Sequence, residues 1–130
     1  MGRRGMSKYF SEEFFKEVET GLAADAAWQQ ATKGVKSTIK LGATDQGLSY
    51  LVTIEDGRTT IGKTDGTVQA EFAFEGSYES WTKVGKGEVD LQQAVLKGML
   101  KFTGSITKIL FYKDRFVRMA DVMKSIPVEF

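Results

Sequence analysis

The chain contains no cysteine and no histidine among its 130 residues. The absence of cysteine excludes disulfides, thiolate nucleophiles and thiolate metal sites. The absence of histidine excludes His-dependent catalytic triads and most transition-metal sites. Glu71 and Glu75 are interpreted as solvent-facing charges of one strand rather than as a catalytic carboxylate pair. We therefore expect no metal, no cofactor and no catalytic residue, and we expect that the protein is not an enzyme.

An excess of one charge and long apolar segments are also lacking. Eighteen Lys and Arg residues against 17 Asp and Glu residues leave a net charge of +1, whereas nucleic-acid-binding domains usually carry a strongly basic face. No apolar segment approaches the roughly 18 residues that a membrane-spanning helix needs. The N-terminal MGRRGM has no apolar stretch typical of a secretory signal. We expect a cytoplasmic protein with no nucleic-acid partner.

The spacing of the apolar residues predicts an α+β domain. Helices are predicted over 12–20, 22–33, 77–84, 91–97 and 106–125, and strands over 35–41, 48–54, 58–63, 68–74 and 99–103. Gly21 is expected to separate the first two helices, and Pro127 prevents the last helix from continuing. We expect one domain over 7–126, between a flexible N-terminal tail (1–6) and a C-terminal tail (127–130).

The segment VDLQQAVLKGMLKFTGS, residues 89–105, holds two glycines close to lysines, an arrangement that could suggest a phosphate-binding loop. However, the chain contains neither GxGxxG nor GxxxxGK[ST]. We interpret Gly98 and Gly104 as turn residues, because glycine adopts a positive φ at little cost. Asp90 is expected to cap the short helix of this segment.

The same segment also follows an ordered pattern: an acidic cap, a short helix with an alanine, and then Gly-x-Leu-x-aromatic-x-Gly. Its positions are Asp90, Ala94, Gly98, Leu100, Phe102 and Gly104. With the preceding EFAFEGSYESWTKVGKGEVD and with Gly34-Val35, the pattern resembles the sterol carrier protein two, or nonspecific lipid-transfer, family. The chain departs from that family in Lys97, where a polar residue such as Gln is usual, and in a longer, more charged C-terminal segment.

The resemblance implies a mostly antiparallel five-stranded sheet that is covered by helices on one face and encloses an apolar tunnel. It implies non-catalytic binding, shielding or transfer of a fatty acid, an acyl-CoA or a sterol-like lipid. The ligand-binding residues that it implies are Phe72, Phe74, Trp81, Val84, Val95, Leu96, Met99, Phe102, Ile106, Ile109, Leu110, Phe116, Met119 and Met123. Ordinary core packing is the alternative explanation for these aromatic residues and methionines. Lys97, Arg115 and Arg118 could contact an anionic headgroup, with solvated surface charges as the alternative.

The last predicted helix carries more apolar residues than a core-facing stripe needs. One arc contains Ile109, Tyr112, Phe116, Met119, Ala120 and Met123. Leu110 and Val117 extend that arc, whereas Phe111 and Val122 fall among charged residues on the opposite side. Exposed residues of this kind indicate a cavity, a membrane surface or a partner subunit. The alternatives to lipid binding are therefore a homodimer or another protein-interaction module, or an accessory domain of an acyl-CoA-using system, and transient membrane contact is compatible with each.

Overall fold

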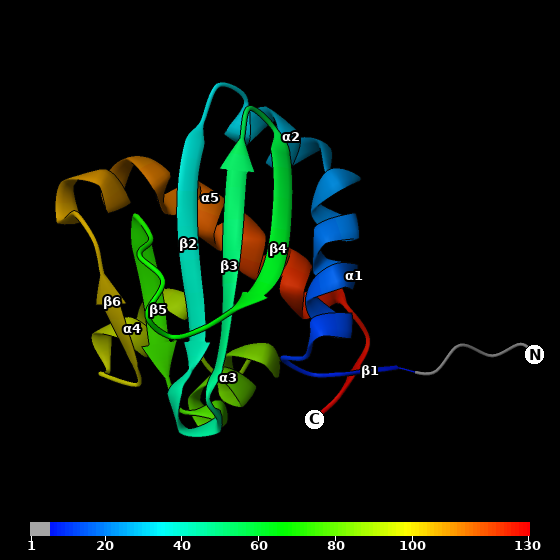
Figure 1. The fold of residues 1–130 in the computed structure, drawn as a ribbon, viewed down its shortest axis with the longest axis vertical. Coiled ribbons are helices and arrows are strands. Elements are labelled where there is room, and N and C mark those ends of the chain that lie inside the picture. Colours follow the sequence, from blue (N-terminus) through cyan, green and yellow to red (C-terminus); the bar gives the residue numbers. More distant parts are fainter. Residues whose placement is uncertain (1–5) are drawn as a thin grey trace, which may run out of the picture.

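The computed structural model describes residues 6–130. The N-terminal part of the chain forms two helices, α1 (Glu12–Ala23) and α2 (Ala26–Thr32). The hydroxyl of Ser11 accepts a hydrogen bond from the backbone N–H of Phe14 at 3.2 Å and caps α1. The two helices lie at one edge of the sheet (Figure 1).

Gly21 does not separate the two helices, contrary to the prediction. Helix α1 continues through Gly21 to Ala23, and α2 begins where the Asp25 carboxylate accepts a hydrogen bond from the backbone N–H of Trp28 at 2.8 Å. A Cβ on Gly21 would lie 3.1 Å from a methyl carbon of Val122, so the glycine allows the last helix to pack closely on α1. Val122 is consequently buried, although its charged neighbours predicted exposure.

Five strands form one sheet in the order β4-β3-β2-β5-β6 (Figure 1). Their bounds are β2 (Lys36–Ala43), β3 (Leu48–Glu55), β4 (Arg58–Thr64), β5 (Phe72–Gly76) and β6 (Leu100–Thr103). Only the β2–β5 pair is parallel, and the other three neighbouring pairs are antiparallel. The prediction of an α+β fold with a mostly antiparallel five-stranded sheet is confirmed.

The strand predicted over 68–74 begins only at Phe72, because the residues before it cross the outer face of the sheet (Figure 1). Lys40 holds this crossing segment: its Nζ donates a hydrogen bond to the carbonyl oxygen of Gly66 at 3.0 Å. The same Nζ lies 3.4 Å from a carboxylate oxygen of Glu75. The Glu75 carboxylate is thus half-buried and paired with Lys40. The prediction that Glu75 is a solvated charge is wrong.

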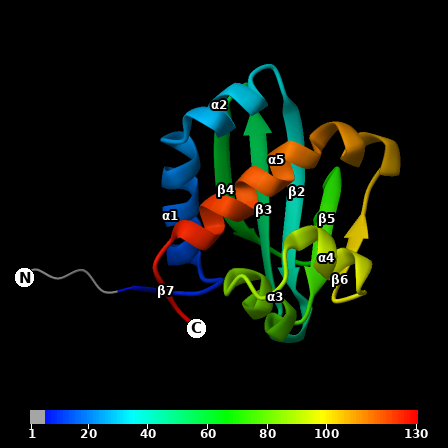
Figure 2. The ribbon, with the colours of Figure 1, turned by 180° about the vertical axis from the view of Figure 1, so that it is seen from behind.

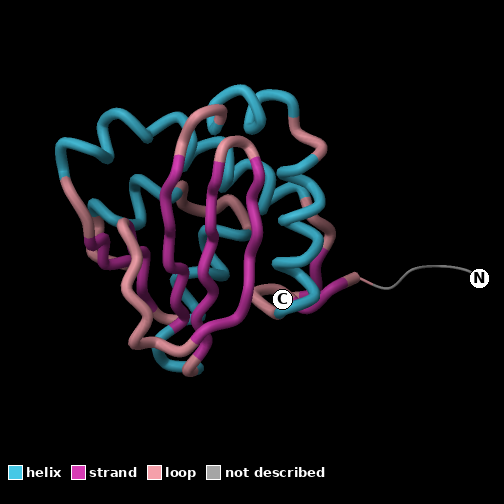
Figure 3. Tube along the Cα trace, turned by 45° about the horizontal axis from the view of Figure 1, so that its top comes forward, coloured by secondary structure: helices cyan, strands magenta, loops and turns pink. Residues whose placement is uncertain are grey.

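Helices α3 (Tyr78–Gly85), α4 (Leu91–Leu96) and α5 (Ile106–Ser125) lie on the other face of the sheet (Figures 2 and 3). The described residues also form the 3-10 turn η1 (Thr44–Gln46) and the short strands β1 (Ser7–Lys8) and β7 (Val128–Glu129). Strands β1 and β7 pair in parallel, so the segment 127–130, expected as a tail, contributes a strand beside β1. Of the tail expected over 1–6, only Met6 falls within the described residues.

Two buried tryptophans connect the helices to the sheet. Trp28 of α2 donates a hydrogen bond from its indole nitrogen to the hydroxyl of Thr59 at 2.8 Å. Trp81 of α3 donates in the same way to the carbonyl oxygen of Gly42 at 2.8 Å. Because both indoles are almost fully buried, these hydrogen bonds satisfy groups that would otherwise lose their water partners.

Two arginines of α5 tie this helix to α2. The guanidinium of Arg118 forms a two-pronged ion pair with Asp25, with 2.8 Å between Nε and Oδ2. The hydrogen bond from Arg118 lowers the pKa of Asp25 to about 2. Arg115 donates from Nε to the carbonyl oxygen of Ala31 at 2.5 Å. These contacts fix one side of α5 and leave its other side facing α4.

Candidate functional site

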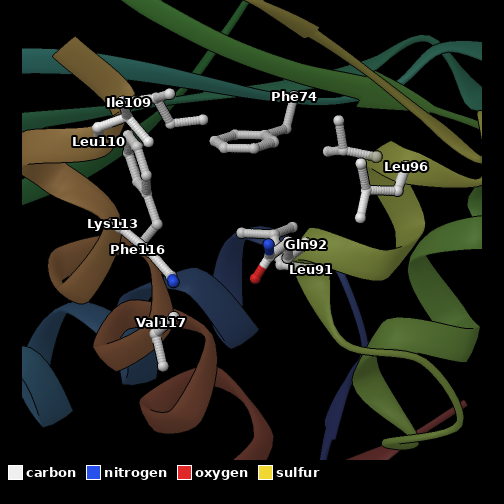
Figure 4. Close-up of a pocket in the computed structure, with 10 residues that line it drawn as sticks. Phe74, Leu91, Gln92, Leu96, Ile109, Leu110, Lys113, Phe116 and Val117 are labelled. Atoms are coloured by element: carbon white, nitrogen blue, oxygen red, sulfur yellow. The ribbon is translucent and has the colours of Figure 1, made fainter. Parts of the chain in front are cut away.

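An apolar groove with a volume of about 200 Å³ lies between α4 and α5, over β5 (Figure 4). Strand β5 provides its floor and the two helices provide its walls. The lining residues are Phe74 from β5, Leu91, Gln92, Val95 and Leu96 from α4, and Ile109, Leu110, Lys113, Phe116 and Val117 from α5. Eight of these ten residues are apolar, so the groove offers an oily surface with very few polar groups.

The wall that α4 contributes is set by a capping box and by helical spacing. The Asp90 carboxylate accepts a hydrogen bond from the backbone N–H of Gln93 at 2.7 Å, and the Gln93 side chain returns to the Asp90 backbone. Leu91 and Val95, four residues apart, then share the face toward the groove. Gly98 ends this wall with a φ of 75°, which turns the chain from the helix into β6.

The wall that α5 contributes has a deep side and an outer side. Phe116 lies deep in the groove, where its ring meets that of Phe74 edge to face with 5.3 Å between the centroids. Leu110, Lys113 and Val117 recur every three or four residues on the outer side. Leu110 is 72% exposed and Val117 is 48% exposed. The groove is therefore open to solvent along the outer side of α5.

The only charged group of the groove is Lys113, and Gln92 is its only other polar side chain. They come from opposite walls and face one another across the opening (Figure 4). Within residues 6–130, Lys113 takes part in no salt bridge. By contrast, Arg115 and Arg118, which the sequence suggested for a headgroup, are directed to α2. The groove thus presents one ammonium and one amide to anything that enters it.

A neighbouring cavity of about 110 Å³ continues the groove along α5. It shares Leu91, Gln92 and Val117 with the groove. Its far end contains the charged side chains of Asp121 and Lys124. The space along α5 is therefore apolar in its middle and polar toward the C-terminal end of the helix.

An ion pair attaches the first turn of α5 to the start of β5. Lys108 Nζ lies 2.7 Å from a carboxylate oxygen of Glu71, and the hydroxyl of Ser37 donates a hydrogen bond to the other oxygen at 2.5 Å. Burial disfavours the charged form of Glu71, but the hydrogen bonds from Lys108 and Ser37 outweigh it and lower its pKa. The prediction that Glu71 is a solvated charge is therefore wrong.

The structure brings six of the predicted ligand-binding residues into the groove. They are Phe74, Val95, Leu96, Ile109, Leu110 and Phe116. Four others pack between α3 and α5 around a space of only about 10 Å³: Trp81, Val84, Met119 and Met123. Phe72 is fully buried beside Phe116, whereas Met99 and Phe102 are half-buried. Ile106 lies outside the groove and is 73% exposed.

Four lining residues were not among the predicted ligand contacts: Leu91, Gln92, Lys113 and Val117. Leu91 lies one turn before Val95, and Val117 lies one turn after Lys113, so helical spacing could have identified them. Nothing in the sequence distinguishes Gln92 from other exposed polar residues. Lys113 becomes recognisable only once α4 is placed opposite α5.

The remaining chemistry of the described residues is limited. Within residues 6–130, no three carboxylates lie close enough to hold a metal ion. In the same part of the chain, no helix combines the length and the apolar character that crossing a membrane requires. Larger hollows lie beside α1, but charged side chains such as Glu13 and Lys16 line them. We therefore take the apolar groove as the candidate ligand site.

The model of the SCP-2 sterol transfer family matches residues 15–115 of this chain. No curated protein is significantly similar to it in sequence. One similar solved structure is that of a conserved hypothetical protein of Thermus thermophilus, described as possibly a sterol carrier protein. It is 19% identical to this chain with a TM-score of 0.79, and the similarity covers 98% of this chain and 95% of that one. A sterol carrier protein 2 structure is 17% identical with a TM-score of 0.80, covering 92% of this chain and 99% of that chain.

The same fold is also similar to part of a larger enzyme. The inverting sec-alkylsulfatase Pisa1 from a Pseudomonas species is 16% identical to this chain with a TM-score of 0.53. The similarity covers 78% of this chain but only 14% of the sulfatase. At these identities the likeness concerns the fold.

Proposed function

This chain belongs to the SCP-2 sterol transfer family, and we propose that it binds one lipid in the groove between α4 and α5 and shields the apolar part of that lipid from water. Membership of the family supports lipid binding or transfer in general. The observation that carries the proposal is the composition of the groove, in which apolar side chains form the floor and most of both walls. Each methylene group that leaves water there contributes about 0.8 kcal/mol.

The ligand that fits best is an acyl chain with an anionic headgroup, such as a fatty acid. Lys113 supplies the only charge in the groove, and Gln92 supplies amide donors on the opposite wall. An anionic head placed between them keeps its contact with water while the chain lies against Phe74 and Phe116. A sterol, which carries no charge, would use Gln92 alone.

The size of the groove limits how much of a ligand it holds in this conformation. Its volume of about 200 Å³ is below the roughly 300–1,000 Å³ of typical small-molecule sites. A long acyl chain therefore extends into the adjoining cavity beside Val117 or moves α4 away from α5. The elongated enclosed tunnel that the resemblance implies would arise if α4 moved away from α5.

The mechanism is thermodynamic. The lining contains no carboxylate and no hydroxyl group, and Lys113 is its one side chain that could act as a nucleophile or a general acid. In this proposal Lys113 binds and orients the head of the ligand. An accessory role beside an acyl-CoA-using enzyme is compatible with this binding step. In Pisa1, a sulfatase, a similar fold forms part of a longer enzyme chain.

The proposal is tested by filling the groove. Val117→Trp places an indole on the outer wall, and Thr107→Trp places the same indole on an exposed position of α5 outside the lining. We expect displacement of a fluorescent fatty acid to show affinity at least about ten-fold weaker in the Val117 variant. The Thr107 variant should bind as the unchanged protein does. Equal affinity in all three proteins would contradict binding in this groove.

Native mass spectrometry provides a second readout of the same proposal. Protein purified from cells should carry a mass adduct that organic extraction removes and identifies as a lipid. The adduct should be depleted in Val117→Trp and retained in Thr107→Trp. An adduct of equal abundance in both variants would place the lipid elsewhere on the protein.

A further inference from the structure

The chain offers few side chains that form a covalent bond with a ligand, because it contains no cysteine and no histidine. Lysine is the remaining residue whose amine reacts readily with carbonyl groups, with which it forms imines. One lysine, Lys113, lines the apolar groove. The groove therefore places an amine beside the polar end of any aliphatic ligand that it holds.

The surroundings of Lys113 differ from those of other lysines in the chain. Lys40 and Lys108 form ion pairs with carboxylates. Lys16 lines the hollows beside α1 together with the carboxylate of Glu13. By contrast, eight of the ten residues that line the groove are apolar, and none of the ten is a carboxylate. Lys113 is thus an amine in contact with an apolar site.

The nearest carboxylates in the chain do not line the groove. Asp114 follows Lys113 in the sequence but is absent from the lining, and Asp90 lines the adjoining cavity. Within residues 6–130, Lys113 takes part in no salt bridge. Its nitrogen is therefore accessible to a ligand in the groove without first breaking an ion pair among the described residues.

The geometry of the groove places the nitrogen of Lys113 where the functional group of a ligand lies. The side chain points into the opening and faces Gln92 on the opposite wall (Figure 4). Phe74 and Phe116 lie deeper, with 5.3 Å between their ring centroids. A ligand whose chain lies against these rings holds its terminal group between the amine and the amide.

We propose that the groove captures straight-chain aliphatic aldehydes and that Lys113 forms an imine with them. This inference rests on the proposed function, because the groove must first hold the aliphatic chain. The Lys113 nitrogen gives a proton to water and donates its electron pair to the aldehyde carbon. A C–N bond forms, the C–O bond breaks, and the oxygen leaves as water. An ammonium and an aldehyde thus give a protonated imine and one water molecule, and no oxidant or reductant is consumed.

Two features of the groove favour Lys113 over the other amines. The apolar walls hold the chain of the aldehyde and so raise its effective concentration at this nitrogen. The Gln92 amide donates a hydrogen bond to the carbonyl oxygen, which stabilises the negative charge that develops there during attack. Lys101, which is exposed and does not line the groove, has neither advantage. An aldehyde too short to reach the rings gains little from the first feature.

The inference is tested by trapping the imine. The protein is incubated with decanal or with butanal in the presence of sodium cyanoborohydride, which reduces an imine to a stable amine. Peptide mass spectrometry then locates the labelled lysines. We expect decanal to label Lys113 at least about ten-fold more than any other lysine, and butanal to show a preference below about three-fold. Decanal labelling spread evenly over the exposed lysines would overturn the inference.

A pair of variants and a competitor check where the reaction occurs. Lys113→Arg keeps a cation in the groove but removes the amine, because the guanidinium group stays protonated. Preferential labelling should disappear in this variant and remain at Lys113 in the matched control, Lys101→Arg. An excess of decanoate should suppress the label at Lys113. Undiminished labelling of Lys113 under saturating decanoate would place the reaction outside the groove and overturn the inference.

Fatty-acid binding by the unchanged protein separates this inference from the proposed function. If decanoate displaces a fluorescent fatty acid but decanal shows no preference for Lys113, the covalent step is refuted and the proposed function stands. If no fatty acid binds and no lysine is preferred, both are refuted. Preferential labelling of Lys113 without fatty-acid binding would support the aldehyde and refute the anionic ligand.

Discussion

The role given to Lys113 makes a prediction that depends on the chemistry of the ligand. Lys113→Met removes the ammonium but keeps a side chain of similar reach against the groove wall. The informative ligands are a fatty acid and a fatty alcohol with the same chain. The acid presents an anionic head to Lys113, whereas the alcohol presents a neutral head at the same place.

The expected magnitude follows from the exposure of Lys113. An ion pair between fully exposed groups contributes only about 0.2–1 kcal/mol, and a hydrogen bond to a charged group that is shielded from water contributes about 1.5–3 kcal/mol. Lys113 lines the groove but is exposed, so we expect a contribution of about 1 kcal/mol. Lys113→Met should therefore weaken binding of the acid about five-fold and leave binding of the alcohol unchanged.

Isothermal titration of both ligands at low and high salt measures this difference. The matched control is Lys101→Met, which removes an exposed lysine of β6 that does not line the groove. The control should bind both ligands as the unchanged protein does. An equal loss for acid and alcohol in Lys113→Met, or no loss for either, would refute the assignment of Lys113 to the headgroup.

Two further predictions concern the stability of the scaffold. Trp28→Phe leaves the buried hydroxyl of Thr59 without its donor. Urea unfolding followed by circular dichroism should therefore show a free energy of unfolding that is lower by about 1–3 kcal/mol. An unchanged unfolding midpoint would contradict the role of this hydrogen bond. Because Arg118 lowers the pKa of Asp25 to about 2, the contribution of this carboxylate to stability is present above its ordinary pKa and is lost as the pH falls toward 2. In Arg118→Met the unfolding midpoint should depend less on pH between about 4 and 2, and identical pH profiles would argue against the pair.

Much of the fold could be predicted because its signals are local. The period of two identified the hairpin strands, and Asp56-Gly57 marked the turn between β3 and β4, where both residues have positive φ. Gly98, with its φ of 75°, marked the turn into β6. The parallel pairing of β2 with β5 could not be predicted in this way, because it depends on a chain crossing that the interaction of Lys40 with Gly66 stabilises at long range.

The candidate site was only partly predictable for the same reason. A helical wheel shows which residues of α5 share a face, but it does not show which neighbour each face meets. The face that holds Arg115 and Arg118 meets α2, and the face that holds Lys113 meets the groove. Trp81 and Met119 satisfied the apolar pattern equally well and are packed in the core. That the groove residues contact a ligand stays a prediction.

The most direct measurement of the central claim is the position of a bound lipid. Nuclear Overhauser effects between a carbon-13-labelled fatty acid and the methyl groups of the protein report which side chains lie next to the chain of the ligand. We predict contacts with Leu91, Val95 and Val117, which line the groove. Contacts with methyl groups outside the groove, such as those of Ile54, in place of these three would contradict the account.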